Sequence, residues 1–359
     1  MSSSISDAHA VDKGEVELSL CTFCGAICNE GYDPNKVSFQ EYDFSNDHSP
    51  LFAKYQEELI KELVERHDIR NKVVLEIGSG EGVFLKAICK VGQNRGIGID
   101  PGFDVKDEKK LDCSFIKDFY SPESVNLKPD IVFCRHVLNV ISDQKGLLQT
   151  LRNNLDDCPE TVVYIEVPDA MHTFRNQVFW NVSYEHRFWF IAASLRFLLE
   201  SCGFEVMDVR NRWHDEFLSI EARPTGKVKG TEGIKDSERR DLLDTCFSFQ
   251  DAFRVLKDSY DEKINVLRRD SKKVVAWGAG ARAVTFFNLC KLNGLIPAVV
   301  DINTLRQGKY LPGSAQPIIA PGDIPTYDPD VVVITNPTYA DEIMDSVKKM
   351  GFNPDFWVL

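Results

Sequence analysis

Short apolar runs alternate with helical stretches between residues 73 and 222, and this alternation constrains the fold more than any other feature of the chain. The runs are Val73–Ile77, Gly96–Ile99, Ser114–Ile116, Ile131–Cys134, Thr161–Ile165, Glu205–Val209 and Phe217–Ala222. A second alternation begins at Lys273, with runs at Val274–Trp277, Ala298–Asp301, Val331–Thr335 and Phe356–Leu359. Strand-length runs separated by helices are typical of largely parallel sheets covered by helices. The sequence therefore predicts an α/β protein with a doubly wound sheet followed by a second α/β domain.

Between and around these units the chain has a different character. Residues 1–50 should form an N-terminal arm, whose first 14 residues are rich in Ser and Asp and predicted to be mobile. The first α/β unit is expected over residues 51–225, beginning with a helix at 51–66. A polar, glycine-containing linker and one long helix should occupy residues 226–270. The second α/β unit then spans residues 271–359.

Charge and cysteine usage exclude some classes of partner. The chain has 42 Lys and Arg against 55 Asp and Glu, a net charge of −13, so its surface should repel nucleic acid. No apolar run reaches the length of a membrane span, and the first residues lack the pattern of a signal peptide. Most of the ten cysteines stand singly in apolar segments, as buried reduced thiols do. We therefore expect a cytoplasmic protein.

A glycine-rich turn follows the first run. Val73–Ile77 should be a strand, Gly78-Ser79-Gly80-Glu81-Gly82 the turn, and Val83–Lys90 the next helix. Glycines let a backbone bend sharply and approach a ligand closely, and ligands of such sheets bind beyond the carboxyl ends of the strands. The next run ends at Asp100, whose carboxylate can accept hydrogen bonds from both hydroxyls of a ribose. By glycine spacing alone, a nicotinamide dinucleotide would fit as well.

Two features of this turn resemble motif I of class I methyltransferases, which use S-adenosylmethionine (SAM). An acid, Glu76, stands two residues before the first glycine, and glycines take alternate positions of the turn. The resemblance implies that Glu76 places the methionine end of SAM and that Asp100 holds its ribose. Asp118 and Phe119 would contact the adenine. The complete implied donor site is Glu76, Gly78, Ser79, Gly80, Gly82, Asp100, Asp118, Phe119 and Arg135.

The segment Ser183-Tyr184-Glu185-His186 is similar to the Tyr-x-Glu-His segment of the methyltransferases that branch nucleotide-linked deoxysugars at carbon. In that family the last His is the proposed base, which removes a proton from the carbon next to a ketone. The resemblance implies His186 as the base, with Glu185, Tyr184 and His136 as further catalytic candidates. Ser183 stands in the slot of the family's Tyr, so Tyr184 is one place removed. A structural role for His186 within its aromatic surroundings is the alternative.

The second glycine turn, Gly278-Ala279-Gly280, follows a strand, and Asp301 ends the next one. By itself this is a dinucleotide fingerprint. Together with the segments Gly308–Gly313 and Asp341–Ile343, it also resembles the Rossmann-like C-terminal domain of the same sugar C-methyltransferases. That domain helps to bind the nucleotide diphosphate of the acceptor, and a helix N-terminus suits a diphosphate. The implied acceptor residues are His214, Gly278, Ala279, Arg282, Asp301, Lys309 and Tyr310.

Two segments depart from the family. His214-Asp215-Glu216-Phe217 stands where the family has His-Gly-Gly-Ser, which adds bulk and negative charge to the acceptor pocket. Cys21, Cys24 and Cys28 stand where the family has a zinc module of two Cys-x2-Cys pairs. These thiolates could bind zinc with His48 as a fourth ligand, although vestigial cysteines are the preferred interpretation.

The sequence thus predicts a SAM-dependent methyltransferase that acts on a small, nucleotide-linked sugar, by C-methylation next to a keto group. O- or N-methylation of another small metabolite stays open, because the acceptor segments depart from the family. An NAD(P)-dependent oxidoreductase or a bifunctional enzyme stays open because of the second glycine turn. So does a non-catalytic protein that keeps the donor fold. The acceptor, its methylated atom, the stereochemistry and the oligomeric state are not determined by the sequence.

Overall fold

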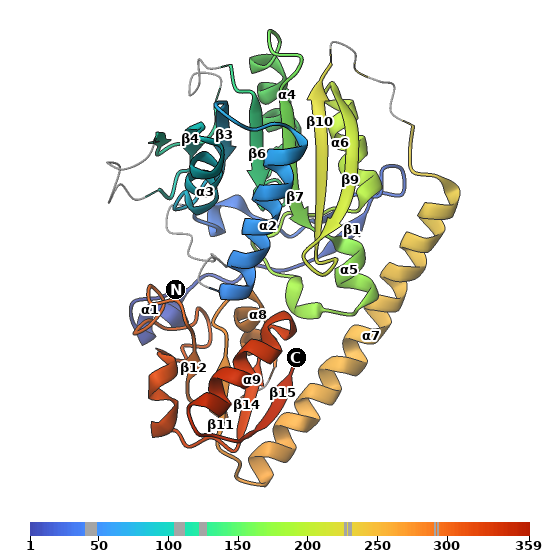
Figure 1. Cartoon of the computed structure of the whole chain (residues 1–359). Helices are drawn as coiled ribbons and strands as arrows, with labels where there is room; N and C mark the ends of the chain where they lie inside the picture. The colour runs from blue at the N-terminus through green and yellow to red at the C-terminus, as the bar shows by residue number, and fades with distance from the viewer. Residues whose placement is uncertain are drawn as a thin grey trace.

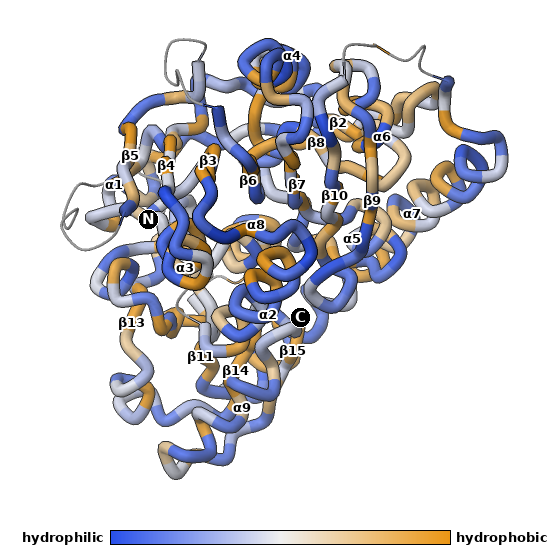
Figure 2. The backbone as a smooth tube through the Cα atoms, turned by 45° about the horizontal axis from the view of Figure 1, so that its top comes forward, coloured by the Kyte–Doolittle hydropathy of each residue, from blue (hydrophilic) through white to orange (hydrophobic). Residues whose placement is uncertain are grey.

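The computed structural model describes residues 1–39, 49–103, 112–121, 128–225, 228, 232–290, 292 and 294–359. Two sheets lie one above the other in Figure 1, and the long helix α7 (Asp236–Arg269) runs along one side of both. Figure 2 shows that α7 alternates between hydrophilic and hydrophobic residues along its length. Such alternation lets one side of the helix pack on the protein while the other faces water.

The larger sheet has seven strands in the order β5-β4-β3-β6-β7-β10-β9. All seven predicted runs are strands: β3 (Val73–Ile77), β4 (Arg95–Ile99), β5 (Cys113–Ile116), β6 (Ile131–Arg135), β7 (Val162–Pro168), β9 (Phe204–Arg212) and β10 (Phe217–Pro224). Pairing is parallel except around β10, which is antiparallel to both neighbours. Because Phe217 at the start of β10 pairs with Pro168 at the end of β7, the β9–β10 loop lies at the carboxyl edge of the parallel strands.

Helices cover both faces of this sheet, as the doubly wound prediction requires. One face packs against α2 (Pro50–Arg66) and α3 (Val83–Gly92) through residues such as Leu63, Ile88 and Val74. The other face packs against α4 (Gln144–Asn154) and α6 (Ala192–Ser201) through residues such as Leu151, Leu195 and Leu75. Val74 and Leu75 are neighbours in β3 and point to opposite faces because side chains alternate along a strand.

The smaller sheet is fully parallel, with the order β13-β12-β11-β14-β15. Its strands are β11 (Val274–Trp277), β12 (Val299–Val300), β13 (Ile318–Ile319), β14 (Val331–Ile334) and β15 (Asp355–Val358), and its helices are α8 (Ala281–Leu289) and α9 (Ala340–Lys349). Four of these strands match predicted runs. The two-residue β13 was not predicted, because its pattern is too short to be recognised. The fold class is therefore α/β, with a doubly wound sheet and a Rossmann-like C-terminal unit.

The N-terminal residues differ from the expectation of a mobile arm. Helix α1 (Ile5–Ala10) buries Ala8, and the main chain of Ser2 exchanges two hydrogen bonds with Tyr310, of 3.0 and 2.9 Å. Further along, β1 (Leu18–Leu20) and β2 (Ile27–Asn29) form a three-stranded sheet with β8 (Phe188–Trp189). Contacts with residues distant in sequence hold this arm in place, and its composition gives no sign of them.

The remaining elements are short. They are α5 (Ala170–Arg175) and the 3-10 helices η1 (Pro34–Lys36), η2 (Phe179–Asn181), η3 (Pro321–Thr326) and η4 (Pro337–Tyr339). No helix in the described ranges combines the length and the apolar character that crossing a bilayer requires.

Candidate active site

A cavity of about 1100 Å³ lies where the carboxyl edges of the two sheets face each other. Gly78 and Asp100, which follow β3 and β4, line one part of it. Gly278 and Asp301, which follow β11 and β12, line the other part. A typical small-molecule site has a volume of about 300–1,000 Å³. This cavity lies slightly above the upper end of that range, and it reaches both glycine turns.

The first glycine turn is shaped by the space around it. Gly78 has a φ of +75°, and a Cβ there would lie 2.0 Å from Val137 Cγ2. Gly80 has a φ of +51°, and no atom lies within 4 Å of the place of its Cβ, so the turn leaves room for a ligand at this point. Asp100 supports the turn, because its Oδ2 accepts a hydrogen bond of 2.8 Å from Gly80 N. Ser79 Oγ is buried and has no hydrogen-bond partner among the described residues.

These features fit a nucleoside ligand. The open face at Gly80 gives it space, Ser79 offers an unused polar atom, and the Asp100 carboxylate lines the cavity next to them. Asp118 and Phe119 also line the cavity, and Phe119 is an exposed residue. Glu76 is buried at the base of the turn. Gly82 is the exception among the predicted donor residues, because it packs against Phe115 and does not line the cavity.

Arg135, at the end of β6, and Glu166, in β7, form a buried ion pair near the carboxyl edge of the larger sheet. Arg135 Nη2 lies 3.1 Å from Glu166 Oε1, and the guanidinium stacks on Phe84 at 4.2 Å. The hydroxyls of Tyr55 and Tyr164 lie 2.5 and 3.0 Å from Glu166 Oε2. Burial opposes ionisation of this carboxyl, but the charge of Arg135 and these hydrogen bonds hold the pKa of Glu166 below its usual range. Arg135 lines the cavity with its charge already balanced by Glu166.

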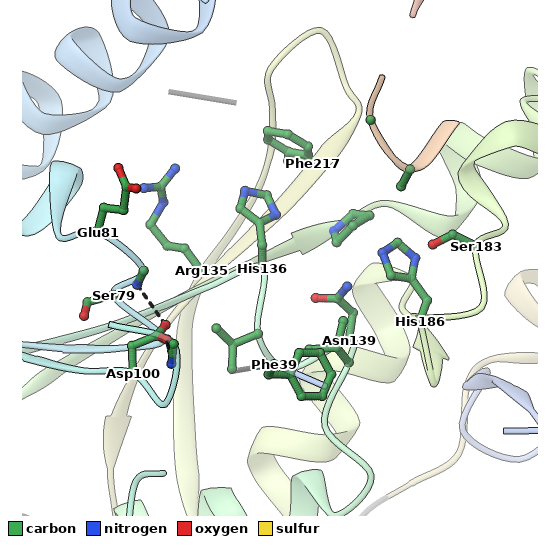
Figure 3. A pocket seen from close by; sticks show the side chains of 18 of the residues that line it. Phe39, Ser79, Glu81, Asp100, Arg135, His136, Asn139, Ser183, His186 and Phe217 are labelled. Carbon is green, nitrogen blue, oxygen red and sulfur yellow. Dashed lines mark hydrogen bonds between the residues drawn. The ribbon is translucent and has the colours of Figure 1, made fainter. Parts of the chain in front are cut away.

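His136 follows Arg135 in an unusual backbone conformation, with a φ of +57°. Its Nε2 lies 3.1 Å from Glu166 Oε1, its amide donates to Glu166 O at 2.7 Å, and its ring packs edge-on against Phe217 at 4.5 Å. A left-handed backbone is uncommon for residues other than Gly, although His adopts it more often than most, and such conformations gather at functional sites. The contacts fix the imidazole at the cavity wall (Figure 3).

Asn139, Ser183 and His186 form the next part of the wall. Figure 3 shows His136 between Arg135 on one side and Asn139 and His186 on the other. The Asn139 main-chain oxygen accepts hydrogen bonds from the amides of Arg187 and Phe188, of 2.9 and 3.0 Å, which ties the two segments together. Asn139 Oδ1 and His186 Nδ1 are buried without a hydrogen-bond partner in the described part of the chain. Two polar atoms on this wall are therefore available to a ligand.

Burial of the His186 ring, with a contribution from nearby His136, lowers the pKa of His186 to about 4. The imidazole is therefore neutral near pH 7 and can accept a proton.

Several sequence-predicted residues lie elsewhere. Tyr184 stacks on Tyr32, and its hydroxyl accepts from Asp33 N at 2.8 Å and lies 3.3 Å from Gly31 O. It thus holds the N-terminal arm and does not line the cavity, and Glu185 beside it does not line the cavity either. The other predicted residues outside the cavity lining are His214, Ala279, Lys309 and Tyr310.

Each of these has a local reason. His214 is exposed on the β9–β10 loop, and Ala279 N donates to Asp301 Oδ2 at 2.7 Å. Lys309 and Tyr310 belong to the segment that pairs with Ile318, Pro317 and Ser2.

Arg282 reaches the cavity, but its guanidinium is engaged. It lies 2.6 Å from Glu216 Oε2 and 2.6 Å from Asn181 Oδ1, and it also hydrogen-bonds to Asn336. Thr338 donates to the other Glu216 oxygen. Arg282 was expected to hold a phosphate of the acceptor. Its charge is balanced by Glu216, which stands at one of the two positions where the family is expected to have glycine.

The cysteines of the arm lie apart from the cavity lining. Cys28 Sγ contacts Ser19 Oγ at 3.1 Å and Glu30 Oε1 at 3.2 Å, while Cys21 is exposed and Cys24 half-buried. Within the described ranges, no three His, Cys, Asp or Glu side chains are grouped so that they could hold a metal ion. His48, named as a further zinc ligand, lies outside the described residues.

Other residues of the wall were not predicted from the sequence. Tyr32 and Phe39 of the arm line the cavity, as do Asn181, Arg306 and Asn336. These residues come from segments without a glycine turn or a family motif. Only the three-dimensional arrangement shows that they meet.

The two halves of the chain match two described families. Residues 51–209 match a methyltransferase domain, and residues 221–356 match a C-methyltransferase C-terminal domain. The chain is also 24% identical over 353 residues to the C-methyltransferase NovU of Streptomyces niveus, covering 93% of this chain and 83% of NovU.

Solved structures are similar to about half of the chain. One is magnesium protoporphyrin IX methyltransferase from Synechocystis PCC 6803 with bound SAH, at 14% identity and a TM-score of 0.37, covering 48% of this chain and 84% of that one. Another is the 1,6-didemethyltoxoflavin-N1-methyltransferase of Burkholderia thailandensis, at 15% identity and a TM-score of 0.37, covering 49% of this chain and 81% of that one.

Proposed function

Because this chain is a SAM-dependent methyltransferase with a C-methyltransferase C-terminal domain, we propose that it methylates a carbon atom of a small keto sugar. The observation that carries the proposal is that the glycine turns of both sheets open into one cavity, with His186 on its wall. One turn would hold the donor and the other side the acceptor. Because the second turn shares the cavity of the first, a separate oxidoreductase site in the C-terminal unit is not proposed.

Donor binding is assigned to the first turn. Ser79 and Gly80 would contact the nucleoside, Asp100 its ribose, and Asp118 and Phe119 the adenine. When bound, SAM supplies a methyl group on a positively charged sulfur, which a carbon nucleophile can take without further activation. The acidic lining of this part of the cavity suits that charge. Arg135 fixes Glu166 at the sheet edge and so holds the rim of the donor site in place.

Proton removal is assigned to His186. Its neutral imidazole would take a proton from the carbon next to the acceptor carbonyl, which leaves an enolate as the nucleophile. Asn139 would position the acceptor by hydrogen bonding, since its carboxamide oxygen has no partner among the described residues. His136 lines the wall between the two sites and would face the reacting groups. The protein would thus contribute in two ways: it removes the proton, and it aligns the acceptor carbon with the methyl group.

The acceptor proposed is a sugar, and the proposal does not extend to its nucleotide. A nucleotide linkage, implied by the family resemblance, would be favoured by a cation whose charge is free to meet a diphosphate. The arginines that line the described part of the cavity are Arg135, Arg282 and Arg306, and each faces a carboxylate. The polar atoms of the wall without a partner among the described residues, Asn139 Oδ1 and His186 Nδ1, can bind the hydroxyl groups of a sugar.

The test is methyl transfer from deuterium-labelled SAM to a panel of keto sugars, followed by mass spectrometry and NMR. We expect the label on a carbon atom adjacent to the former carbonyl. Label on oxygen or nitrogen would replace this proposal by O- or N-methylation. A second measurement isolates the proton step. With S-adenosylhomocysteine (SAH) in place of SAM and D2O as solvent, the unaltered protein should exchange the acceptor's α-proton for deuterium, and a variant that lacks His186 should not.

A further inference from the structure

The arginines of the cavity wall share one property, which is a carboxylate partner. Arg135 pairs with Glu166 at 3.1 Å, Arg282 with Glu216 at 2.6 Å, and Arg306 with Asp301 at 3.1 Å. All three pairs are largely buried. Charges screened from water in this way are strongly coupled to their partners. A negatively charged ligand would therefore meet cations whose charge a buried carboxylate already balances.

The pair at Arg282 decides what the acceptor half of the cavity can bind. The side chains of Arg282 and Glu216 are 14% and 10% exposed. Glu216 also accepts from Thr338, while Asn181 and Asn336 each accept from a further N–H group of Arg282. A phosphate that displaced Glu216 would leave a buried carboxylate without its cation, which is strongly unfavourable.

The loop that carries Glu216 is fixed. Trp213, His214 and Asp215 all adopt left-handed conformations, with φ of +47°, +55° and +65°. Trp213 anchors the loop by packing on Phe52 at 5.2 Å and on Tyr339 at 6.1 Å. A backbone in this conformation persists only where its surroundings hold it. The backbone at Glu216 is therefore held beside Arg282, and the Glu216 carboxylate is bonded to both Arg282 and Thr338.

We propose that Glu216 is a specificity-determining residue that neutralises Arg282 and selects an uncharged, hydroxyl-rich acceptor over one that carries a diphosphate. This inference rests on the proposed function, because it concerns the acceptor half of the same cavity. The polar groups of that half are mostly neutral, namely those of Asn139, Asn181, Ser183, Asn303, Thr335 and Asn336. Amides and hydroxyls suit sugar hydroxyls.

The experiment compares thymidine and thymidine diphosphate as probes, by calorimetry at saturating SAH. For the unaltered protein we expect the diphosphate to bind no more tightly than the nucleoside. Glu216→Gln keeps the shape of the side chain and frees the charge of Arg282. It should raise the affinity for thymidine diphosphate about tenfold, as expected for a charge-assisted hydrogen bond, and high salt should reduce the gain.

Asp215→Asn is the matched control, since it removes the same charge from the same loop at an exposed position that does not contact Arg282. It should bind both probes like the unaltered protein. The proposal is overturned if the unaltered protein prefers the diphosphate tenfold, if Glu216→Gln gains nothing, or if Asp215→Asn gains as much. The comparison of the two probes on the unaltered protein stands even if Glu216→Gln does not fold. None of these measurements uses methyl transfer, so their failure leaves the proposed reaction intact.

Discussion

His136 and His186 illustrate how surroundings separate two identical side chains. His136 lies beside the ionised Glu166, at 3.1 Å, and is held in a left-handed backbone. The His186 side chain is partly buried, its Nδ1 is shielded from solvent, and its ring meets Trp189 edge-on at 5.7 Å. Burial disfavours a charged imidazole. The His186 imidazole is therefore neutral at pH 7, with a pKa lowered to about 4.

The pH dependence of the reaction tests this assignment. Because folding lowers the pKa of His186 to about 4, the neutral form persists as the pH falls through 6.5 and is lost only as the pH nears 4. We expect kcat/KM for methyl transfer to stay level from about pH 8 to about pH 5.5. His186→Gln should lower kcat by about 100-fold and leave SAH affinity unchanged. A decline centred near 6.5, or an unchanged kcat, would remove His186 from the reaction.

Gly80 provides the residue-scale test of donor binding. A valine there would enter the open space of the cavity, since no protein atom lies within 4 Å of its Cβ. We expect Gly80→Val to abolish SAH binding in calorimetry. Gly351→Val is the matched control, because Gly351 also has a positive φ, of +86°, with no atom within 4 Å, and does not line the cavity. Both variants should lose about 1 kcal/mol of stability from the strained backbone, but Gly351→Val should bind SAH normally.

At the scale of elements, the strand β8 and the segment before it connect the N-terminal arm to the cavity. Phe188 and Trp189 pair with Cys28 and Ile27 of β2. Tyr184 adds a stack on Tyr32 and hydrogen bonds to the main chain of the arm. The arm in turn places Tyr32 on the cavity wall. Tyr184 thus affects the site through the element that it holds and not through its own phenol.

Tyr184→Phe separates these two roles. The variant keeps the ring stack and loses the hydrogen bonds to Asp33 N and Gly31 O. We expect about 1 kcal/mol of lost stability, faster proteolysis of the arm, and an unchanged kcat at saturating acceptor. A kcat reduced 100-fold without faster proteolysis would instead give the phenol a chemical role.

At the scale of the whole molecule, side chains at the cavity join the two α/β units. Arg282 and Thr338 of the C-terminal unit contact Glu216 of the larger sheet's loop. Ser49, which caps helix α2, donates to Glu342 of α9 at 3.3 Å. Because the cavity lies between the units, these contacts also set the spacing of its two walls.

Arg282→Met should therefore destabilise the protein. It leaves Glu216 buried without its cation, which costs about 3 kcal/mol. Arg175→Met is the control, since Arg175 pairs with Asp241 at 2.5 Å but both side chains are 55% exposed. Exposed pairs contribute less than about 1 kcal/mol. Denaturant unfolding measures both, and equal losses would show that Glu216 does not depend on Arg282.

The sequence by itself determined the strands, the long helices and both glycine turns. Val73–Ile77 and Gly78–Gly82 are recognisable because neighbouring residues encode their periodicity and backbone conformations. Glu76, Asp100 and His186 could be named for the same reason, as members of short motifs. Tertiary structure decided what no local pattern contains: Tyr184 holds the arm, Glu216 meets Arg282 across 66 residues of sequence, and Ser2 pairs with Tyr310. Contacts of this kind depend on how elements pack, and packing is a property of the complete fold.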